Sequence, residues 1–141
     1  QVANAGANVL DDYEEGSYTP AISESGGQTP TAAAGSSKLS YTKIGRLVNV
    51  MGTIQIDNID SGSGALRIAL PFTPKANDVG TGYHASMVGT YSVDILGDGE
   101  SVYAQIAPST AYIALYAVRD GDTAVNQITT GYYRMEVTFE I

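Results

Sequence analysis

The sequence predicts an all-β fold, an antiparallel β-sandwich of jelly-roll type, and three observations support this prediction. The composition includes 16 Gly and 10 Tyr but only two Phe, a mixture that favours turns and strands over helices. The C-terminal segment GYYRMEVTFEI alternates apolar and polar residues with the period of a strand. About seven short strand-like runs follow one another without an amphipathic helix between them, which favours a sandwich or barrel over a βαβ arrangement.

Two runs have the clearest alternation, and each is expected to be a strand buried on one side. In residues 46–57, Gly52 interrupts an apolar face, which indicates a bulge or a close neighbour. The other members of that face are Val48, Val50, Ile54 and Ile56. In residues 131–141, the apolar face consists of Tyr133, Met135, Val137, Phe139 and Ile141.

Four further runs have strand-like composition: residues 64–70, 84–95, 101–107 and 110–119. Gly, Pro, Asp or Ser stands between them where turns need these residues. The last of these runs has enough Ala and Leu for a short helix. Because turn signals flank it on both sides and it is short, we expect a strand.

The 141 residues are enough for one domain with one hydrophobic core. We expect residues 1–22 to be an N-terminal lead-in or linker and residues 38–141 to form the sandwich. Residues 23–37, SESGGQTPTAAAGSS, contain no large apolar side chain and are expected to be a low-complexity loop. That loop is either an exposed excursion or an ordered strap lying on a neighbour.

Charge and composition exclude several partners. Fifteen acidic and seven basic residues give a formal net charge of -8, which opposes binding to nucleic acid and to anionic membrane surfaces. No apolar run is long enough for membrane insertion. The absence of cysteine excludes disulfides and thiolate metal sites, and no cofactor is expected.

Three motifs in a fixed order give the sequence a family resemblance. They are LDDYEEGSYTP at 10–20, YTKIGRLVNVMGTI at 41–54 and ALRIALPF at 65–72. This order resembles a module near the C-terminal ends of tail-fibre, tail-spike and other virion structural proteins of tailed bacteriophages. Ser17 and Tyr18 stand where that family often has Thr-Trp, and the likeness fades beyond Phe72. The resemblance implies a β-rich homotrimeric knob in the virion, at the tip of a fibre or spike, with residues 1–22 joining it to a preceding shaft.

Four carboxylates are crowded into five positions: Asp11, Asp12, Glu14 and Glu15. The preferred interpretation is structural ion pairing with Lys43 and Arg46, above all a contact between Arg46 and one of the last three acids. The alternative is an acidic lead-in whose carboxylates are simply solvated and form no ion pair. The cluster lacks the Asp-x-Asp-x-Asp-Gly spacing of a calcium loop, and a glycosidase pair is expected on rigid strands. The single histidine, His84, has no G-x-S-x-G motif to serve, so no catalytic or metal site is predicted.

Tyrosines supply the candidate contact surfaces. Tyr112, Tyr116 and Val118 share one face of a strand whose other face is also apolar, so we expect a second subunit to cover them. Tyrosine also suits stacking on sugars. The candidates for a glycan-binding patch are Tyr83, Tyr91, Tyr103, Tyr132 and Tyr133, against the alternative of ordinary sheet tyrosines with solvated hydroxyls.

Together with the family resemblance, which implies the virion role and the trimer, the sequence predicts a non-enzymatic virion module that trimerises, contacts other virion proteins and binds polysaccharide or protein on the host surface. One alternative is a decoration or assembly protein without a receptor role. A polysaccharide depolymerase is the third hypothesis. It is disfavoured because the acidic residues fall in turns and in the lead-in and not on adjacent positions of a sheet.

Overall fold

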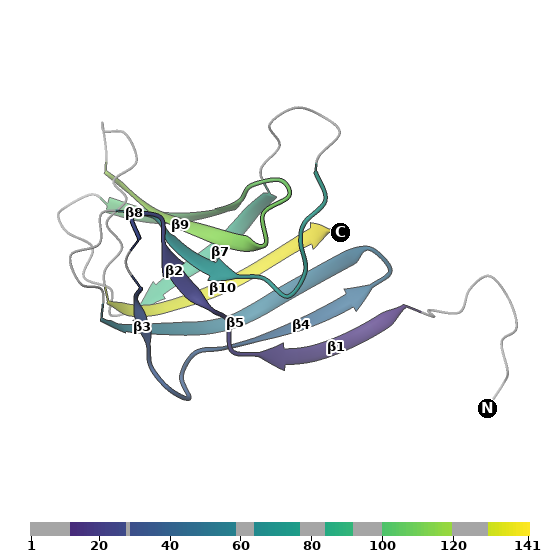
Figure 1. The fold of residues 1–141 in the computed structure, drawn as a ribbon, viewed down its shortest axis with the longest axis horizontal. Coiled ribbons are helices and arrows are strands. Elements are labelled where there is room, and N and C mark those ends of the chain that lie inside the picture. Colours follow the sequence, from purple (N-terminus) through teal and green to yellow (C-terminus); the bar gives the residue numbers. More distant parts are fainter. Residues whose placement is uncertain (1–11, 28, 59–63, 77–83, 92–99, 120–129) are drawn as a thin grey trace, which may run out of the picture.

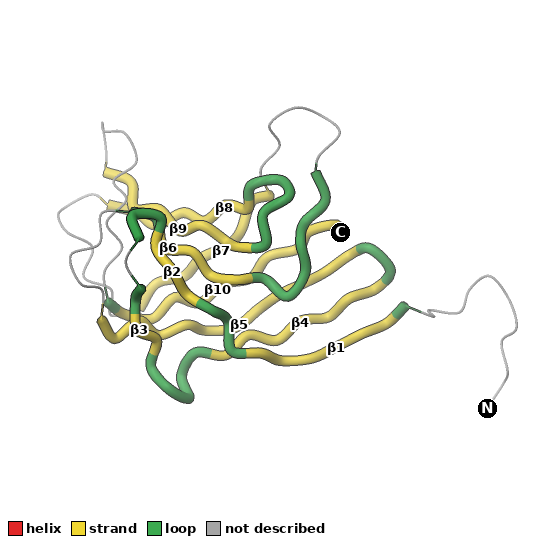
Figure 2. Tube along the Cα trace, viewed as in Figure 1, coloured by secondary structure: helices red, strands yellow, loops and turns green. Residues whose placement is uncertain are grey.

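The computed structural model describes residues 12–27, 29–58, 64–76, 84–91, 100–119 and 130–141, and these ranges contain strands and no helix. Two layers of strands curve over each other (Figures 1 and 2). The strands are β1 (Tyr13–Tyr18), β2 (Ile22–Glu24), β3 (Thr31–Ala32), β4 (Lys38–Ile44), β5 (Leu47–Asn58), β6 (Leu66–Ala69), β7 (His84–Tyr91), β8 (Glu100–Ile106), β9 (Tyr112–Arg119) and β10 (Gly131–Glu140). The predicted all-β antiparallel sandwich is confirmed.

One shared strand joins the two layers. The strand order is β1-β4-β5-β10-β7-β8-β9-β6-β2, with β3 also paired to β5. Residues 87–91 of β7 pair with β10, and residues 84–86 pair with β8. We call the layer from β1 to β10 sheet A and the layer from β8 to β2 sheet B. Hydrogen bonding through β7 distinguishes this fold from the two separate sheets of a jelly roll.

The hydrophobic core lies between the two sheets and follows the alternation of the strands. The four apolar side chains on the inner face of β5 are buried, and so are those of β10 from Tyr133 to Phe139. Sheet B supplies the opposing layer, whose fully buried members include Leu66, Ile68, Ile106, Ile113 and Leu115. The faces predicted for β5 and β10 are thus confirmed, and only the terminal Ile141 is half-buried.

The sequence indicates a bulge or a close neighbour at Gly52, and the structure shows a close neighbour, the backbone of β4. It stands in unbroken register between Leu39 of β4 and Met135 of β10. Its φ is 150°, and a side chain there would meet the carbonyl oxygen of Lys38 and the body of Leu39. Glycine at this position lets β4 approach the centre of sheet A.

A two-residue turn, Gly45-Arg46, joins β4 to β5. Ile44 and Leu47 pair directly on either side of it. Gly45 has φ 59° and Arg46 has a negative φ, which is the pattern of a type II′ turn with glycine at its first central position. The start of β1 and the end of β10 lie at this same end of the molecule (Figure 1).

The observed domain begins earlier than expected, because residues 13–24 belong to the sheets. β1 pairs with β4 over its whole length, and β2 pairs with β6. The short crossing between them carries the chain from the edge of sheet A to the edge of sheet B, where Ala69 donates its N–H to the Ala21 carbonyl at 2.9 Å.

The predicted loop at 23–37 is an ordered strap over most of its described length. It begins inside β2 and includes β3, which pairs with β5. Ser37 bonds both backbone groups of Gln55 through its hydroxyl at 3.1 Å. The strap therefore lies on β6 at its start and on β5 from β3 onward, both in the same chain. The described residues contain no helix that could span a membrane.

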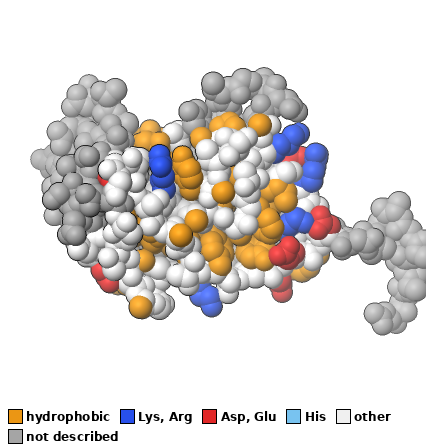
Figure 3. Space-filling view, viewed as in Figure 1, with side chains coloured by type: hydrophobic (Ala, Val, Ile, Leu, Met, Phe, Trp, Pro, Cys, Tyr) orange, Lys and Arg blue, Asp and Glu red, His pale blue; other side chains and the backbone are white. Residues whose placement is uncertain are grey.

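One side of the sandwich, between β1 and the β2–β6 edge, is covered less completely than the core. Half-buried Tyr18, Ile22, Tyr41 and Phe72 pack against the core there. The face in view has hydrophobic side chains across its middle and most of its acidic and basic side chains at one end (Figure 3).

Candidate functional site

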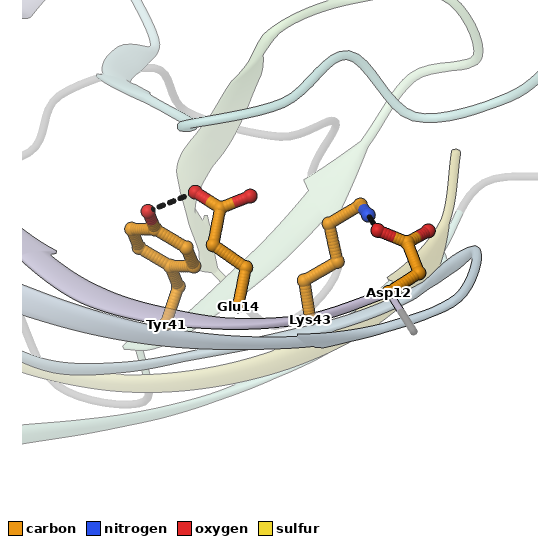
Figure 4. A network of polar contacts seen from close by, with 4 residues as sticks. All are labelled: Asp12, Glu14, Tyr41 and Lys43. Carbon is orange, nitrogen blue, oxygen red and sulfur yellow. Dashed lines mark hydrogen bonds and ion pairs between the residues drawn. The ribbon is translucent and has the colours of Figure 1, made fainter. Parts of the chain in front are cut away.

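Of the described acids of the first motif, Asp12 lies beside β1 and Glu14 lies on it, and β4 supplies the partners of both (Figure 4). Lys43 forms an ion pair with Asp12, although its side chain is only 11% exposed and that of Asp12 is 64% exposed. The Gly45 N–H donates to the Asp12 carbonyl oxygen at 3.0 Å. Asp12 therefore holds both a buried cation and the turn that joins β4 to β5.

Tyr41 is the centre of the same cluster. Its hydroxyl donates to Glu14 at 2.6 Å, and its ring makes edge contacts with Tyr18 and Phe72, at centroid distances of 6.4 and 5.3 Å. The Tyr18 hydroxyl donates to the Ala69 carbonyl oxygen at 3.1 Å and so ties sheet A to sheet B. All three motifs that carry the family resemblance meet here, because β1, β4 and the segment after β6 each contribute an aromatic ring.

The surroundings of Tyr13, Tyr18 and Tyr41 raise the pKa values of their hydroxyls. The hydrogen bond to Glu14 raises the pKa of Tyr41, and burial and the negative charge of Glu14 act in the same direction. Tyr13 donates to Glu15 at 2.6 Å, and this bond raises the pKa of Tyr13. Burial raises the pKa of Tyr18 well above its ordinary value. Each neighbouring carboxylate or apolar surface favours the neutral phenol.

The expected contact of Arg46 with the acidic cluster is wrong. Arg46 pairs instead with Glu140 at 2.7 Å, on the outer side of the β4–β5 turn. The reason is geometric, because Ile141 donates its N–H to the Arg46 carbonyl oxygen at 2.9 Å and brings the end of β10 beside the turn. Alternation along β4 and the turn leaves Lys43 as the base that faces Asp12.

The described acids of the cluster are engaged separately. Asp12 bonds Lys43, Glu14 bonds Tyr41, and Glu15 bonds Tyr13. Glu14 and Glu15 are adjacent on a strand and so lie on opposite faces of sheet A. Such a pair cannot act on one ligand from the same side. No group of acidic or histidine side chains in the described residues is arranged to hold a metal ion, and Asp11 lies outside those residues.

An open groove of about 380 Å³ runs between β1 and β4. Its lining is mostly polar and comprises Glu15, Gly16, Ser17, Ser40, Tyr41 and Thr42. The groove offers hydroxyls and one carboxylate at the edge of sheet A, on a surface that sequence reasoning had not indicated. The groove depends on the pairing of Ser17 with Ser40 across β1 and β4, so it could be located only once the register of these strands was known.

The outer face of sheet B carries an aromatic surface. Tyr103 and Tyr116 pair directly across β8 and β9, and their rings stack with a centroid distance of 5.0 Å and an interplanar angle of 14°. The Arg67 guanidinium lies 4.8 Å from the centre of the Tyr112 ring. Tyr103 is 38% exposed. Tyrosines predicted for two different roles, ligand binding and subunit contact, thus share one face.

Two of the remaining tyrosine candidates, Tyr132 and Tyr133, do not join this face. Tyr132 lies on the outer face of sheet A, and Tyr133 is fully buried in the core, so a surface role for Tyr133 is wrong. Tyr83 lies outside the described residues, and for Tyr91 and Val118 only the backbone is described. The interface roles of Tyr112 and Tyr116 stay predictions, although Arg67 and Tyr103 of the same chain already cover part of their rings.

Comparison with known proteins gives one finding about the fold. No family model matches the sequence, and no curated protein matches it either. Among solved structures, the chain is similar to the crystal structure of the Dettilon tailspike protein, with a TM-score of 0.65 and 19% sequence identity. The match covers 91% of this chain and 24% of the tailspike chain. The chain therefore has a fold that also occurs as one part of a tailspike protein.

Proposed function

We propose that this chain is a structural module of a bacteriophage tail spike or tail fibre, a C-terminal homotrimeric knob of the virion that binds a glycan on the host surface. The observation that carries the proposal is the cluster around Tyr41. Three motifs that resemble tail-spike sequences meet there, on a fold that a tailspike protein also contains.

The described chemistry of the first motif supports a structural role. Each described carboxylate of the cluster bonds a side chain of β1 or β4, and these bonds tie the edge of sheet A together. A glycosidase requires two carboxylates that face one sugar from a common cleft. Glu14 and Glu15 lie on opposite faces, and Asp12 and Glu14 are each bonded to a side chain of β4, which favours a non-enzymatic module over a depolymerase.

The outer face of sheet B is the surface best suited to a glycan. Sugar rings present C–H groups that pack on aromatic faces, and their hydroxyls bond guanidinium and amide groups. Tyr103 and Tyr116 provide the aromatic part, while Arg67 lies two strands away from Tyr103 on the same face. Gln105 and Arg67 stand on either side of Ala114, in the row of residues next to the Tyr103–Tyr116 pair.

Binding of the purified chain to an array of bacterial surface polysaccharides tests this proposal. We expect binding that Tyr103→Ala weakens and that Ser36→Ala, in the exposed turn that precedes β4, leaves unchanged. Absence of binding to every polysaccharide would leave the assembly role without the receptor role. Release of new reducing ends from a bound polysaccharide would contradict the non-enzymatic assignment.

A further inference from the structure

The outer face of sheet A exposes most of the large apolar side chains that the described part of the chain leaves open to solvent. Four of the five such residues lie there: Tyr13, Ile44, Leu47 and Met51, which are 52%, 43%, 54% and 46% exposed. The fifth is Tyr103 on sheet B. Contiguous apolar surface of this kind marks an interaction site more often than scattered single residues do.

Strand pairing makes three of these residues neighbours. Tyr13 stands opposite Ile44 across β1 and β4, and Ile44 stands opposite Leu47 across β4 and β5. The row therefore crosses three strands beside the Gly45-Arg46 turn. Met51 follows Leu47 on the same side of β5, four residues further along. Burial of Val48 and Val50 toward the core requires that Leu47 and Met51 face outward, but it does not require that they be apolar.

The charges on this face nearly cancel, which limits the repulsion between two copies of an acidic chain. Alternation places three bases on or beside the face, namely Lys38, Arg46 and Arg134, and four acids, namely Glu15, Asp57, Glu136 and Glu140. Three bases against four acids leave the face close to neutral, whereas the whole chain has a net charge of -8. Two copies of such a chain repel each other least where their surfaces are neutral and carry both signs.

We propose that a second copy of this chain packs on the outer face of sheet A through the row Tyr13–Ile44–Leu47 and Met51. Small polar side chains between them, Ser40, Thr42 and Asn49, keep the rest of the face low enough for close approach. This inference rests on the self-association in the proposed function, and it moves the interface away from Tyr112, Tyr116 and Val118. It does not depend on glycan binding.

The test is the oligomeric state of paired variants. Ile44→Thr with Leu47→Thr retains strand propensity and removes the apolar row, and Tyr112→Thr with Tyr116→Thr is the matched control on sheet B. Sedimentation of the full chain should show association about 100-fold weaker for the first pair, the effect of losing a strong interface contact, and unchanged for the second. Circular dichroism melting confirms that each variant is folded.

A second probe covers the case in which the first pair does not fold. Because the chain has no cysteine, Leu47→Cys introduces a single thiol on the face, and Ser23→Cys introduces one on sheet B. A short bismaleimide should link subunits at position 47 and not at position 23. Two results would show that the chain self-associates but not through the outer face of sheet A. One is cross-linking only at position 23, and the other is weaker association only for the variant with Tyr112→Thr and Tyr116→Thr. A wild-type chain that stays monomeric would overturn both.

Discussion

Gly16 stands directly opposite Tyr41 across β1 and β4, and the Tyr41 ring occupies the space that a side chain at position 16 would need. A Cβ atom built there would lie 2.8 Å from the Tyr41 ring. The glycine of the first motif and the tyrosine of the second are therefore one packing unit. A side chain at position 16 must therefore displace a ring that also contacts Glu14, Tyr18 and Phe72.

Gly16→Val should lower the free energy of unfolding by about 1 to 3 kcal/mol, the usual effect of overpacking a fitted site. In a Tyr41→Ala background the same substitution should cost much less, because the obstructing ring is gone. Urea denaturation of the four chains of this double-mutant cycle measures the coupling. Additive effects would contradict the packing of Tyr41 over Gly16.

Gly52→Ala should be more damaging than a typical glycine substitution in a strand. Its positive φ strains any side chain, and the added carbon meets the backbone of Lys38, which cannot rotate away. We expect a loss of about 2 to 3 kcal/mol. Gly89→Ala in β7 is the control, since a Cβ there has no atom within 4 Å, and its midpoint should hardly change. Equal losses for both variants would contradict the close approach of β4.

The ion pairs of Lys43 and Arg46 should differ in their effect on the free energy of unfolding. Asp12→Asn leaves the buried Lys43 ammonium without its carboxylate, and we expect a loss of about 1 to 3 kcal/mol. Glu140→Gln removes an exposed partner of Arg46, which should cost at most about 1 kcal/mol. Denaturant midpoints of the two variants compare them directly. A larger loss for Glu140→Gln would reverse the assignment of Lys43 as the cation of the motif cluster.

Alkaline pH should destabilise the fold through its tyrosines. The folded-state pKa values of Tyr13, Tyr18 and Tyr41 are all raised. The folded chain therefore keeps these protons at a pH where the unfolded chain loses them, and stability present below about pH 10 declines as pH rises further. Melting temperatures measured from about pH 8 to 11 should decline less steeply for Tyr18→Phe. Parallel curves for both chains would contradict a raised pKa at Tyr18.

The period-2 alternation located much of the fold, because burial on one side imposes a pattern that a sequence displays directly. The faces of β5 and β10 are examples. Gly45 stands where the two-residue hairpin turn needs a positive φ, a conformation that favours glycine. β1 was assigned to a lead-in because Tyr13, Glu14 and Glu15 are exposed on an edge strand, so no apolar alternation marks it.

The site was harder to predict because its partners are distant in sequence. The pairing of Arg46 with Glu140 depends on where β10 ends, which no local pattern near Arg46 records. The stacking of Tyr103 on Tyr116 depends on the register between β8 and β9. In both cases the residue types were evident, and the strand pairing that selected their partners was not.

Self-association is the claim on which the proposed knob depends, and the mass of the native chain in solution tests it most directly. Sedimentation equilibrium of the wild-type chain, whose single copy has a mass of 14.7 kDa, should give three times that value. A folded species that keeps the mass of one copy at every concentration would contradict the account.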